Sequence, residues 1–167
     1  MSVESGTIVT IHEIKVNTGT DLIEFSLQGT TRGGSGMNVG NRMTSNPVTV
    51  TPGDTLAVAQ EKLRSGGFRQ LPVVDQDRLV GILTDRDLRR HGRHIVAKVQ
   101  SAMTTEVVVT VTPQTPIEEA ARLLLQHKIG GLPVVQDNKL VGIISTTDLL
   151  QTLVDLLSDS KGKGSAR

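Results

Sequence analysis

The chain repeats itself at a constant offset of 61 residues, and this repeat limits the folds that it can adopt. Three phrases return in register: VTVTP at 48–52 and 109–113, LPVV at 71–74 and 132–135, and LVGI at 79–82 and 140–143. An open solenoid needs about three or more units to bury a continuous core. Because the chain holds two copies, we expect them to pack face to face.

Each copy begins with a β-branched run and continues with the signals of a helix. VTVT predicts a short strand, and Asp54 or Thr115 follows it at the position of a helix N-cap. Pro116 then occupies the favoured first helical position in the second copy. Gly66 and Gly67 predict the end of the first helix. Apolar residues at helical spacing predict one buried face in each copy, formed by Leu56, Ala59 and Leu63 or by Ile117, Ala120 and Leu124.

A hairpin and a second helix complete each copy. The turn-like DQD joins LPVV to RLVGIL, and QDN joins the second LPVV to KLVGII. Pro72 and Pro133 indicate an edge or a strand start, because proline cannot donate to a ladder. The order predicts a mixed α/β (α+β) fold of two β-α-β-β-α repeats, packed through their sheets with pseudo-two-fold symmetry.

The repeat divides the chain into four parts. Residues 37–98 hold the first copy, and residues 99–158 hold the second. Residues 1–36 lie outside the repeat: GTIVTIHEIKV and DLIEFSLQ could form a hairpin, whereas the following GGSG has the composition of a flexible linker. This extension is a fused segment or a natural appendage, and its composition favours neither. The polar, glycine-rich residues 159–167 predict a disordered tail.

Composition argues against several classes of function. The formal net charge of +1, from 18 basic and 17 acidic residues, provides no global attraction to nucleic acid or to an anionic membrane. With no tryptophan, no tyrosine and two phenylalanines, the chain lacks an aromatic platform on which bases could stack. The absence of cysteine excludes disulfides and thiolate metal sites and favours a cytoplasmic setting. The four histidines show no spacing typical of metal ligands.

Membrane insertion and catalysis are also not expected. The longest apolar runs, such as LVGIL and VVVTV, are far shorter than the roughly 20 residues of a membrane-spanning helix. No charged and then apolar leader opens the chain. We find no serine-histidine order, no glycine-rich phosphate loop and no paired-carboxylate motif, so we predict that the protein is not an enzyme.

The tandem order resembles a known domain pair. One order of motifs occurs twice between Met43 and Leu157: VTVTP, a helix, LPVV, and LVGI followed by a hydroxyl residue and then an aspartate. This tandem order is similar to a pair of CBS domains, also called a Bateman module. The phrases MTTEVVVTV, HKIGGLPVV and DLLQTLVDLL are most similar to bacterial acetoin-utilisation-type CBS proteins. The resemblance implies two clefts between the repeats that hold an adenosine ligand, such as AMP, ADP, ATP or S-adenosylmethionine, as a bound effector.

The residues fit this expectation at two positions, which we name the Asp87 cleft and the Asp148 cleft. GILTDRDL and GIISTTDL each end a strand at a hydroxyl residue, Thr84 or Ser145, where the free amides of a new helix suit a phosphate. The aspartate one turn later can accept both hydroxyls of a ribose. By the resemblance, adenine should lie in an apolar slot formed by Val48, Phe68 and Pro72 on one side and by Val109, Ile129 and Pro133 on the other.

The same spacing has a simpler structural interpretation. A hydroxyl residue followed three positions later by an acid is also a capping box, so both pairs could serve only to start helices. The two roles are compatible, because a cap holds the groups that a phosphate would contact.

The copies differ in charge beside these pairs. Arg86 of the first copy corresponds to Thr147 of the second, and the stretch RDLRRHGRH could bind a polyphosphate. Alternatively, this stretch is a solvated helix end, where cations complement the negative end of the helix dipole. The difference predicts that the Asp87 cleft prefers more phosphate than the Asp148 cleft. Arg69 and Lys128 could serve either cleft.

These expectations favour a regulatory, non-catalytic module that senses an adenine nucleotide and signals to an unidentified partner protein. The alternative is a ligand-free structural module for dimerisation or interaction. Nucleic-acid binding through the arginine cluster is a minor alternative, which would show a steep salt dependence. We also predict a homodimer, because the last helix has more apolar surface than one internal face needs, from Leu149, Leu150, Leu153, Val154, Leu156 and Leu157.

Overall fold

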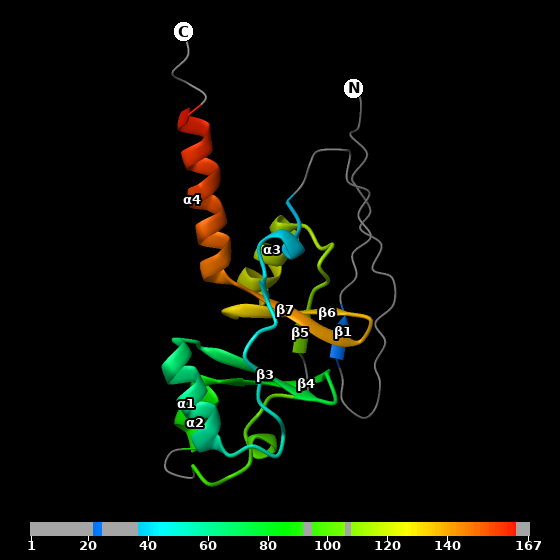
Figure 1. Cartoon of the computed structure of the whole chain (residues 1–167), viewed down its shortest axis with the longest axis vertical. Helices are drawn as coiled ribbons and strands as arrows, with labels where there is room; N and C mark the ends of the chain where they lie inside the picture. The colour runs from blue at the N-terminus through cyan, green and yellow to red at the C-terminus, as the bar shows by residue number, and fades with distance from the viewer. Residues whose placement is uncertain (1–21, 25–36, 92–94, 106–107, 163–167) are drawn as a thin grey trace, which may run out of the picture.

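Two repeats of one α/β unit face each other through their hairpins (Figure 1). Of the 167 residues, the computed structural model describes 22–24, 37–91, 95–105 and 108–162. The first repeat comprises α1 (Leu56–Gly66), β3 (Gln70–Asp75), β4 (Arg78–Thr84) and α2 (Asp85–His91). The second comprises β5 (Val108–Thr110), α3 (Ile117–His127), β6 (Gly131–Gln136), β7 (Lys139–Ser145) and α4 (Thr146–Gly162). This order confirms the predicted repeat of strands and helices.

The strand that opens each repeat is shorter than VTVT predicts. In the first repeat it is reduced to an isolated bridge at Val50, whereas the second repeat forms β5 and a bridge at Val111. Val50 N–H donates to Pro72 O at 3.1 Å, and Val111 N–H donates to Pro133 O at 3.1 Å. Each proline therefore supplies a carbonyl to this bridge, where its missing N–H is not needed.

The helix starts differ from the prediction by one residue. Thr55 is the N-cap of α1 and Pro116 is the N-cap of α3, so the predicted caps Asp54 and Thr115 were wrong, as was the helical position of Pro116. The side chains of Asp54 and Thr115 instead accept hydrogen bonds from the backbone N–H groups three residues earlier. Such local bonds close the turn before the helix and compete with capping.

The predicted hairpins are confirmed. β3 pairs with β4 and β6 pairs with β7, both in antiparallel register. Each turn consists of two residues with positive φ, Gln76 and Asp77 in the first and Asp137 and Asn138 in the second. This conformation is that of a type I′ turn, whose twist matches the flanking strands.

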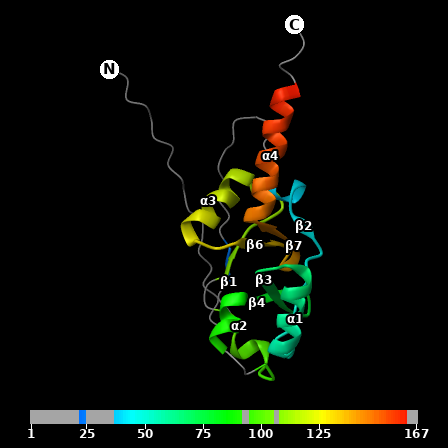
Figure 2. The same ribbon diagram turned by 90° about the vertical axis from the view of Figure 1, so that its left-hand side faces the viewer.

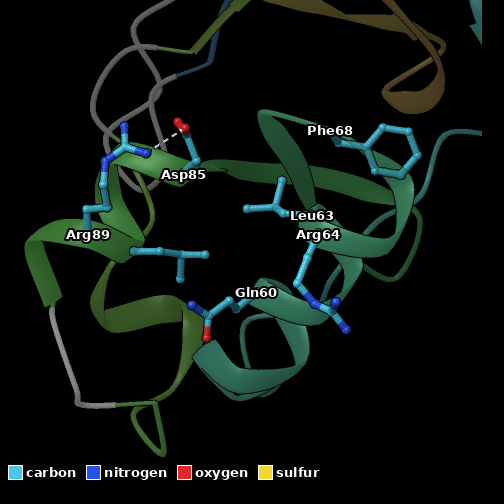
Figure 3. Close-up of a pocket in the computed structure, with 7 residues that line it drawn as sticks. Gln60, Leu63, Arg64, Phe68, Asp85 and Arg89 are labelled. Atoms are coloured by element: carbon cyan, nitrogen blue, oxygen red, sulfur yellow. Dashed lines mark hydrogen bonds and ion pairs between the residues drawn. The ribbon is translucent and has the colours of Figure 1, made fainter.

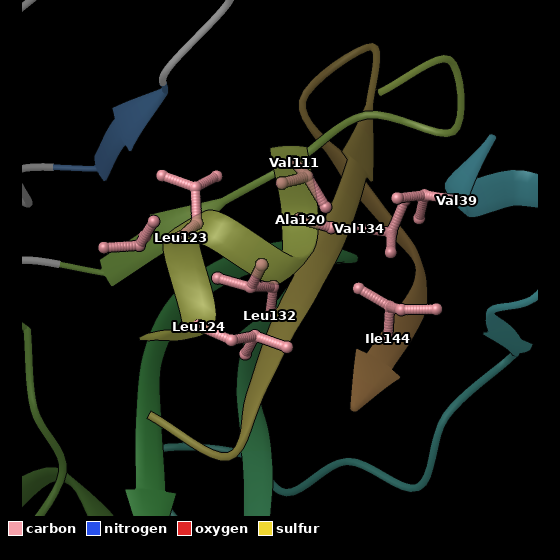
Figure 4. Packing of buried hydrophobic residues seen from close by; sticks show 9 residues of the cluster. Val39, Val111, Ala120, Leu123, Leu124, Leu132, Val134 and Ile144 are labelled. Carbon is pink, nitrogen blue, oxygen red and sulfur yellow. The ribbon is translucent and has the colours of Figure 1, made fainter. Parts of the chain in front are cut away.

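Each repeat has its own hydrophobic core, and each core is completed by a segment from the other half of the chain. Val39, the first residue of the short helix η1 (Val39–Asn41), packs in the second core (Figure 4). Its N–H donates to Thr115 O at 2.8 Å. Val99, at the start of η2 (Val99–Ser101), packs in the first core, and its N–H donates to Asp54 O at 2.9 Å. The boundary predicted at residue 98 separates the two repeats in the sequence. It does not separate the two cores, because each core includes a segment from the other repeat.

This exchange gives the repeated glycine a structural reason. A Cβ on Gly81 would lie 2.9 Å from Thr104 O, and a Cβ on Gly142 would lie 2.5 Å from Met43 Sδ. Thr104 bridges β4, and β2 (Thr44–Ser45) pairs with β7. LVGI thus needs glycine in each copy because the exchanged segment crosses the hairpin there.

The N-terminal extension contributes one described element. β1 (Leu22–Glu24) pairs in parallel with β5. The rest of the hairpin predicted in residues 1–36 lies outside the described residues, as do residues 163–167 of the predicted tail. The start of that tail was predicted too early, because residues 159–162 form the last turn of α4 (Thr146–Gly162). Within the described ranges, no helix combines the length and apolar character required to cross a lipid bilayer.

Candidate functional site

A cavity of about 420 Å³ opens between the two repeats. It is bordered by the segment before β3, by the first-repeat lead-in around Val48, and by the junction of β7 with α4. Seven residues predicted for a ligand site line this cavity: Val48, Phe68, Arg69, Pro72, Ser145, Thr147 and Asp148. The structure therefore brings the apolar slot of the first repeat against the hydroxyl and acid pair of the second repeat.

The end of α1 positions Phe68 in the apolar wall of the cavity, which also contains Val48 and Pro72. Gly67 adopts a left-handed conformation with φ 65°, and Phe68 N–H donates to Leu63 O at 3.0 Å. A Cβ on Gly66 would overlap the Phe68 ring, so Gly66 makes room for the aromatic side chain. Gly67 turns the chain at the end of the helix. Phe68 remains 43% exposed and Val48 remains 42% exposed, which leaves an apolar surface facing the cavity.

The polar wall is a closed capping box. Asp148 Oδ2 accepts hydrogen bonds from Ser145 N–H at 2.7 Å and from Ser145 Oγ at 2.6 Å, and Asp148 N–H donates to Ser145 Oγ at 3.3 Å. The capping interpretation of the sequence is thus realised in the geometry. Within the described part of the chain, no group donates to Asp148 Oδ1, so one carboxylate oxygen stays available to a ligand hydroxyl.

The start of α4 also limits which amides can meet a phosphate. Thr146 N–H donates to Gly130 O at 3.0 Å, and the Ser145 and Asp148 amides are held by the capping box. Among the first-turn amides, Thr147 N–H has no acceptor in the described residues. Arg69 and Asp148 are the charged side chains among the described residues that line the cavity. The wall can therefore bind a small number of anionic oxygens.

The Asp87 cleft repeats the same local geometry. Asp87 Oδ2 accepts from Thr84 N–H at 2.9 Å and from Thr84 Oγ1 at 2.6 Å, and Arg86 is exposed on the first turn of α2. On the facing repeat, Val109 and Pro133 are buried and Ile129 is half-buried. Residues 106–107 lie outside the described residues, and by the repeat offset residue 107 corresponds to Asn46, which lines the Asp148 cleft. Ligand binding at the Asp87 cleft therefore remains a prediction.

Sequence reasoning missed seven residues that line the Asp148 cleft: Thr44, Asn46, Pro47, Gly67, Gln70, Gly130 and Ile143. The repeat offset offers a signal for two of them. Gln70 corresponds to Gly131, and Gly130 corresponds to Arg69, so these positions differ between otherwise similar copies. No comparable signal marks Thr44 or Asn46, because they reach the cleft through the exchanged lead-in.

A second cavity, of about 430 Å³, lies between α1 and α2 (Figure 3). Leu63 and Leu88 contribute apolar surface to it, and two arginines stand at its border. Arg89 pairs with Asp85 at 2.8 Å, and Arg64 pairs with Glu61. These exposed ion pairs on single helices favour the interpretation of the arginine stretch as a solvated helix surface.

Known proteins share this architecture. The chain is 37% identical over 116 residues to the CBS domain-containing protein YhcV of Bacillus subtilis, a match that covers 67% of this chain and 82% of that protein. The crystal structure of a Vibrio cholerae protein described as an acetoin utilization protein (AcuB) superposes with a TM-score of 0.69 at 32% identity, covering 75% of this chain and 96% of that one. CBSX2 in complex with AMP superposes with a TM-score of 0.65 at 32% identity, covering 72% of this chain and 98% of that one.

An enzyme also contains a similar segment. The chain is 38% identical over 112 residues to inosine-5'-monophosphate dehydrogenase of Staphylococcus aureus, and the match covers 65% of this chain but 23% of that enzyme. The similarity therefore concerns a minor part of the dehydrogenase. The family model of the CBS domain matches twice, at residues 39–94 and 96–155, which together span most of the chain. The chain belongs to the CBS domain family, as a tandem CBS pair.

Proposed function

We propose that the protein is a regulatory module that binds an adenosine ligand in the Asp148 cleft and carries out no catalysis itself. The observation that carries this proposal is the cavity between the repeats, which joins an apolar wall to the hydroxyl and acid pair at the start of α4. Adenine suits the wall of Val48, Phe68 and Pro72, because exposed apolar surface is removed from water when a flat base covers it. The free Oδ1 of Asp148 and the Thr147 amide suit the ribose and a first phosphate.

Related structures support this class of ligand. CBSX2 was solved with AMP, and the CBS domain pair of MJ0100 was solved with 5'-methylthioadenosine and S-adenosyl-L-methionine. MJ0100 superposes with a TM-score of 0.66 at 25% identity over 72% of this chain. We therefore extend the candidates to AMP, ADP, ATP and S-adenosylmethionine, with ligand occupancy passed on to a partner protein.

Ligand-dependent melting tests this function. A ligand at about 100 times its Kd stabilises the folded state by about 2.7 kcal/mol, so the melting temperature should rise with AMP or S-adenosylmethionine. Guanosine monophosphate at equal concentration controls for unspecific anion binding. No shift with any adenosine ligand, together with a flat calorimetric titration, would leave the ligand-free structural module as the better explanation.

We further propose that the protein is a homodimer. α4 projects away from the first repeat (Figure 2). Its outer face carries apolar side chains at helical spacing. Of the six apolar residues predicted to form this surface, Leu149 packs against the second core. The other five are between 51% and 59% exposed: Leu150, Leu153, Val154, Leu156 and Leu157. Thr152 is buried, so the other face of the helix already contacts the body. A second copy that buries the outer face forms a closed arrangement with two-fold symmetry.

A further inference from the structure

At one pair of equivalent positions, the first repeat has an amide side chain and the second repeat has glycine. Gln70 begins β3, and Gly131, which lies 61 residues later, begins β6. The two residues meet across the boundary between the repeats, because a Cβ on Gly131 would overlap Gln70 Nε2. Glycine at 131 leaves room for the amide, so a nearly symmetric pair of repeats holds a single donor at this point.

This donor is unpaired. Gln70 Nε2 is buried and has no hydrogen-bond partner within the described part of the chain. Buried N–H groups are destabilising unless they bond to protein, water or a ligand, and nearly all of them do. Gln70 lines the Asp148 cleft, and Gly131, which its amide covers, pairs with Ser145 in the β6–β7 ladder. The unpaired donor therefore lies near the hydroxyl and acid pair of this cleft.

We propose that the Gln70 amide, whose Nε2 is buried without ligand, turns into the Asp148 cleft and donates a hydrogen bond to a ribose or phosphate oxygen of the adenosine ligand, and that this neutral donor selects ligands with at most one phosphate. The inference rests on the proposed function. Arg69 is the one cationic side chain among the described residues of the wall. An uncharged amide gains less from each added phosphate than an arginine, whose guanidinium pairs with two oxygens at once.

The variant Gln70→Met tests the donor, because methionine has a similar length but no N–H group. We expect calorimetric titration of the full chain to show about tenfold weaker AMP binding at the Asp148 cleft. That site is identified as the one lost in Asp148→Ala. Without ligand, the variant should melt at the same or a higher temperature, because an unpaired polar group has been removed. Gln136→Met makes the same change at an exposed position and should alter neither measurement.

The variant Gln70→Arg tests the selection by phosphate number. We expect ATP affinity at the Asp148 cleft to rise relative to AMP affinity by about tenfold, because a charge-assisted donor is then available. Unchanged AMP affinity in Gln70→Met would show that the amide has a structural role only and would overturn the inference while leaving the proposed function intact. A parent chain that binds no adenosine ligand would instead refute the proposed function, and this inference with it.

Discussion

Asp148 combines a structural role and a proposed ligand role, and the substitution Asp148→Ala separates their magnitudes. The carboxylate accepts two hydrogen bonds from Ser145, at 2.7 Å and 2.6 Å, through one oxygen. Loss of a helix cap of this kind costs about 1 kcal/mol in the free energy of unfolding. A carboxylate that also accepts a ribose hydroxyl contributes about 1.5–3 kcal/mol to binding, so the Kd should rise by about tenfold to a hundredfold.

Urea unfolding and calorimetric titration with AMP measure the two effects separately. Asp87→Ala provides a matched control, because Asp87 Oδ2 accepts the equivalent bonds from Thr84 at 2.9 Å and 2.6 Å. Both variants should lose a similar free energy of unfolding. AMP binding at the Asp148 cleft should weaken in Asp148→Ala and stay unchanged in Asp87→Ala.

The reasoning would be refuted by an Asp148→Ala chain that is destabilised by about 1 kcal/mol and still binds AMP as the parent does. The carboxylate would then be a helix cap without a ligand role. Equal weakening in Asp148→Ala and Asp87→Ala would also contradict it, because that result would reflect a general loss of structure.

Three further predictions concern packing, charge and assembly. Gly81→Ala should lower the free energy of unfolding by about 1–3 kcal/mol, because the new Cβ meets the Thr104 carbonyl at 2.9 Å. Gly53→Ala is the control in urea unfolding, because a Cβ there would make only an ordinary contact with Thr51 Oγ1 at 4.0 Å; equal stabilities of the two variants would contradict the packing argument. Hydrogen bonds from Gln151 and Arg42 hold the pKa of Asp155 below its ordinary value of 3.8. The stabilisation that ionised Asp155 gives to the fold is therefore present above pH 3.8 and lost as the pH falls through the lowered pKa. Asp155→Asn should flatten the acid side of a plot of unfolding free energy against pH. An unchanged acid side would show that solvent screens the Arg42–Asp155 pair. Leu153→Glu should convert the proposed dimer to a monomer in light scattering at micromolar concentration. Leu125→Glu is the control, because it places the same charge at a 78% exposed position on α3 and should leave the dimer intact. A monomeric parent chain would refute the proposed interface.

Much of the local structure was predictable from the sequence because it depends on neighbouring residues. The two-residue turns, the αL end of α1 and the apolar faces of α1 and α3 follow from glycine, turn residues and helical spacing. The start of α1 was misplaced because Asp54 and Thr55 are adjacent and both can bond a nearby amide. Nothing in their chemistry decides which side chain closes the turn and which one caps the helix.

The composition of the cleft depended on contacts between distant segments. The 61-residue register by itself determined two equivalent hydroxyl and acid pairs, because a capping box is formed by residues three positions apart. The tertiary structure decided that the Phe68 wall faces Ser145 and Asp148, and that Gln70 covers Gly131. These contacts arise when the lead-in segments cross to the opposite repeat and the hairpins pack together. Such packing is set by the burial of apolar surface over the whole pair, and no local pattern encodes it.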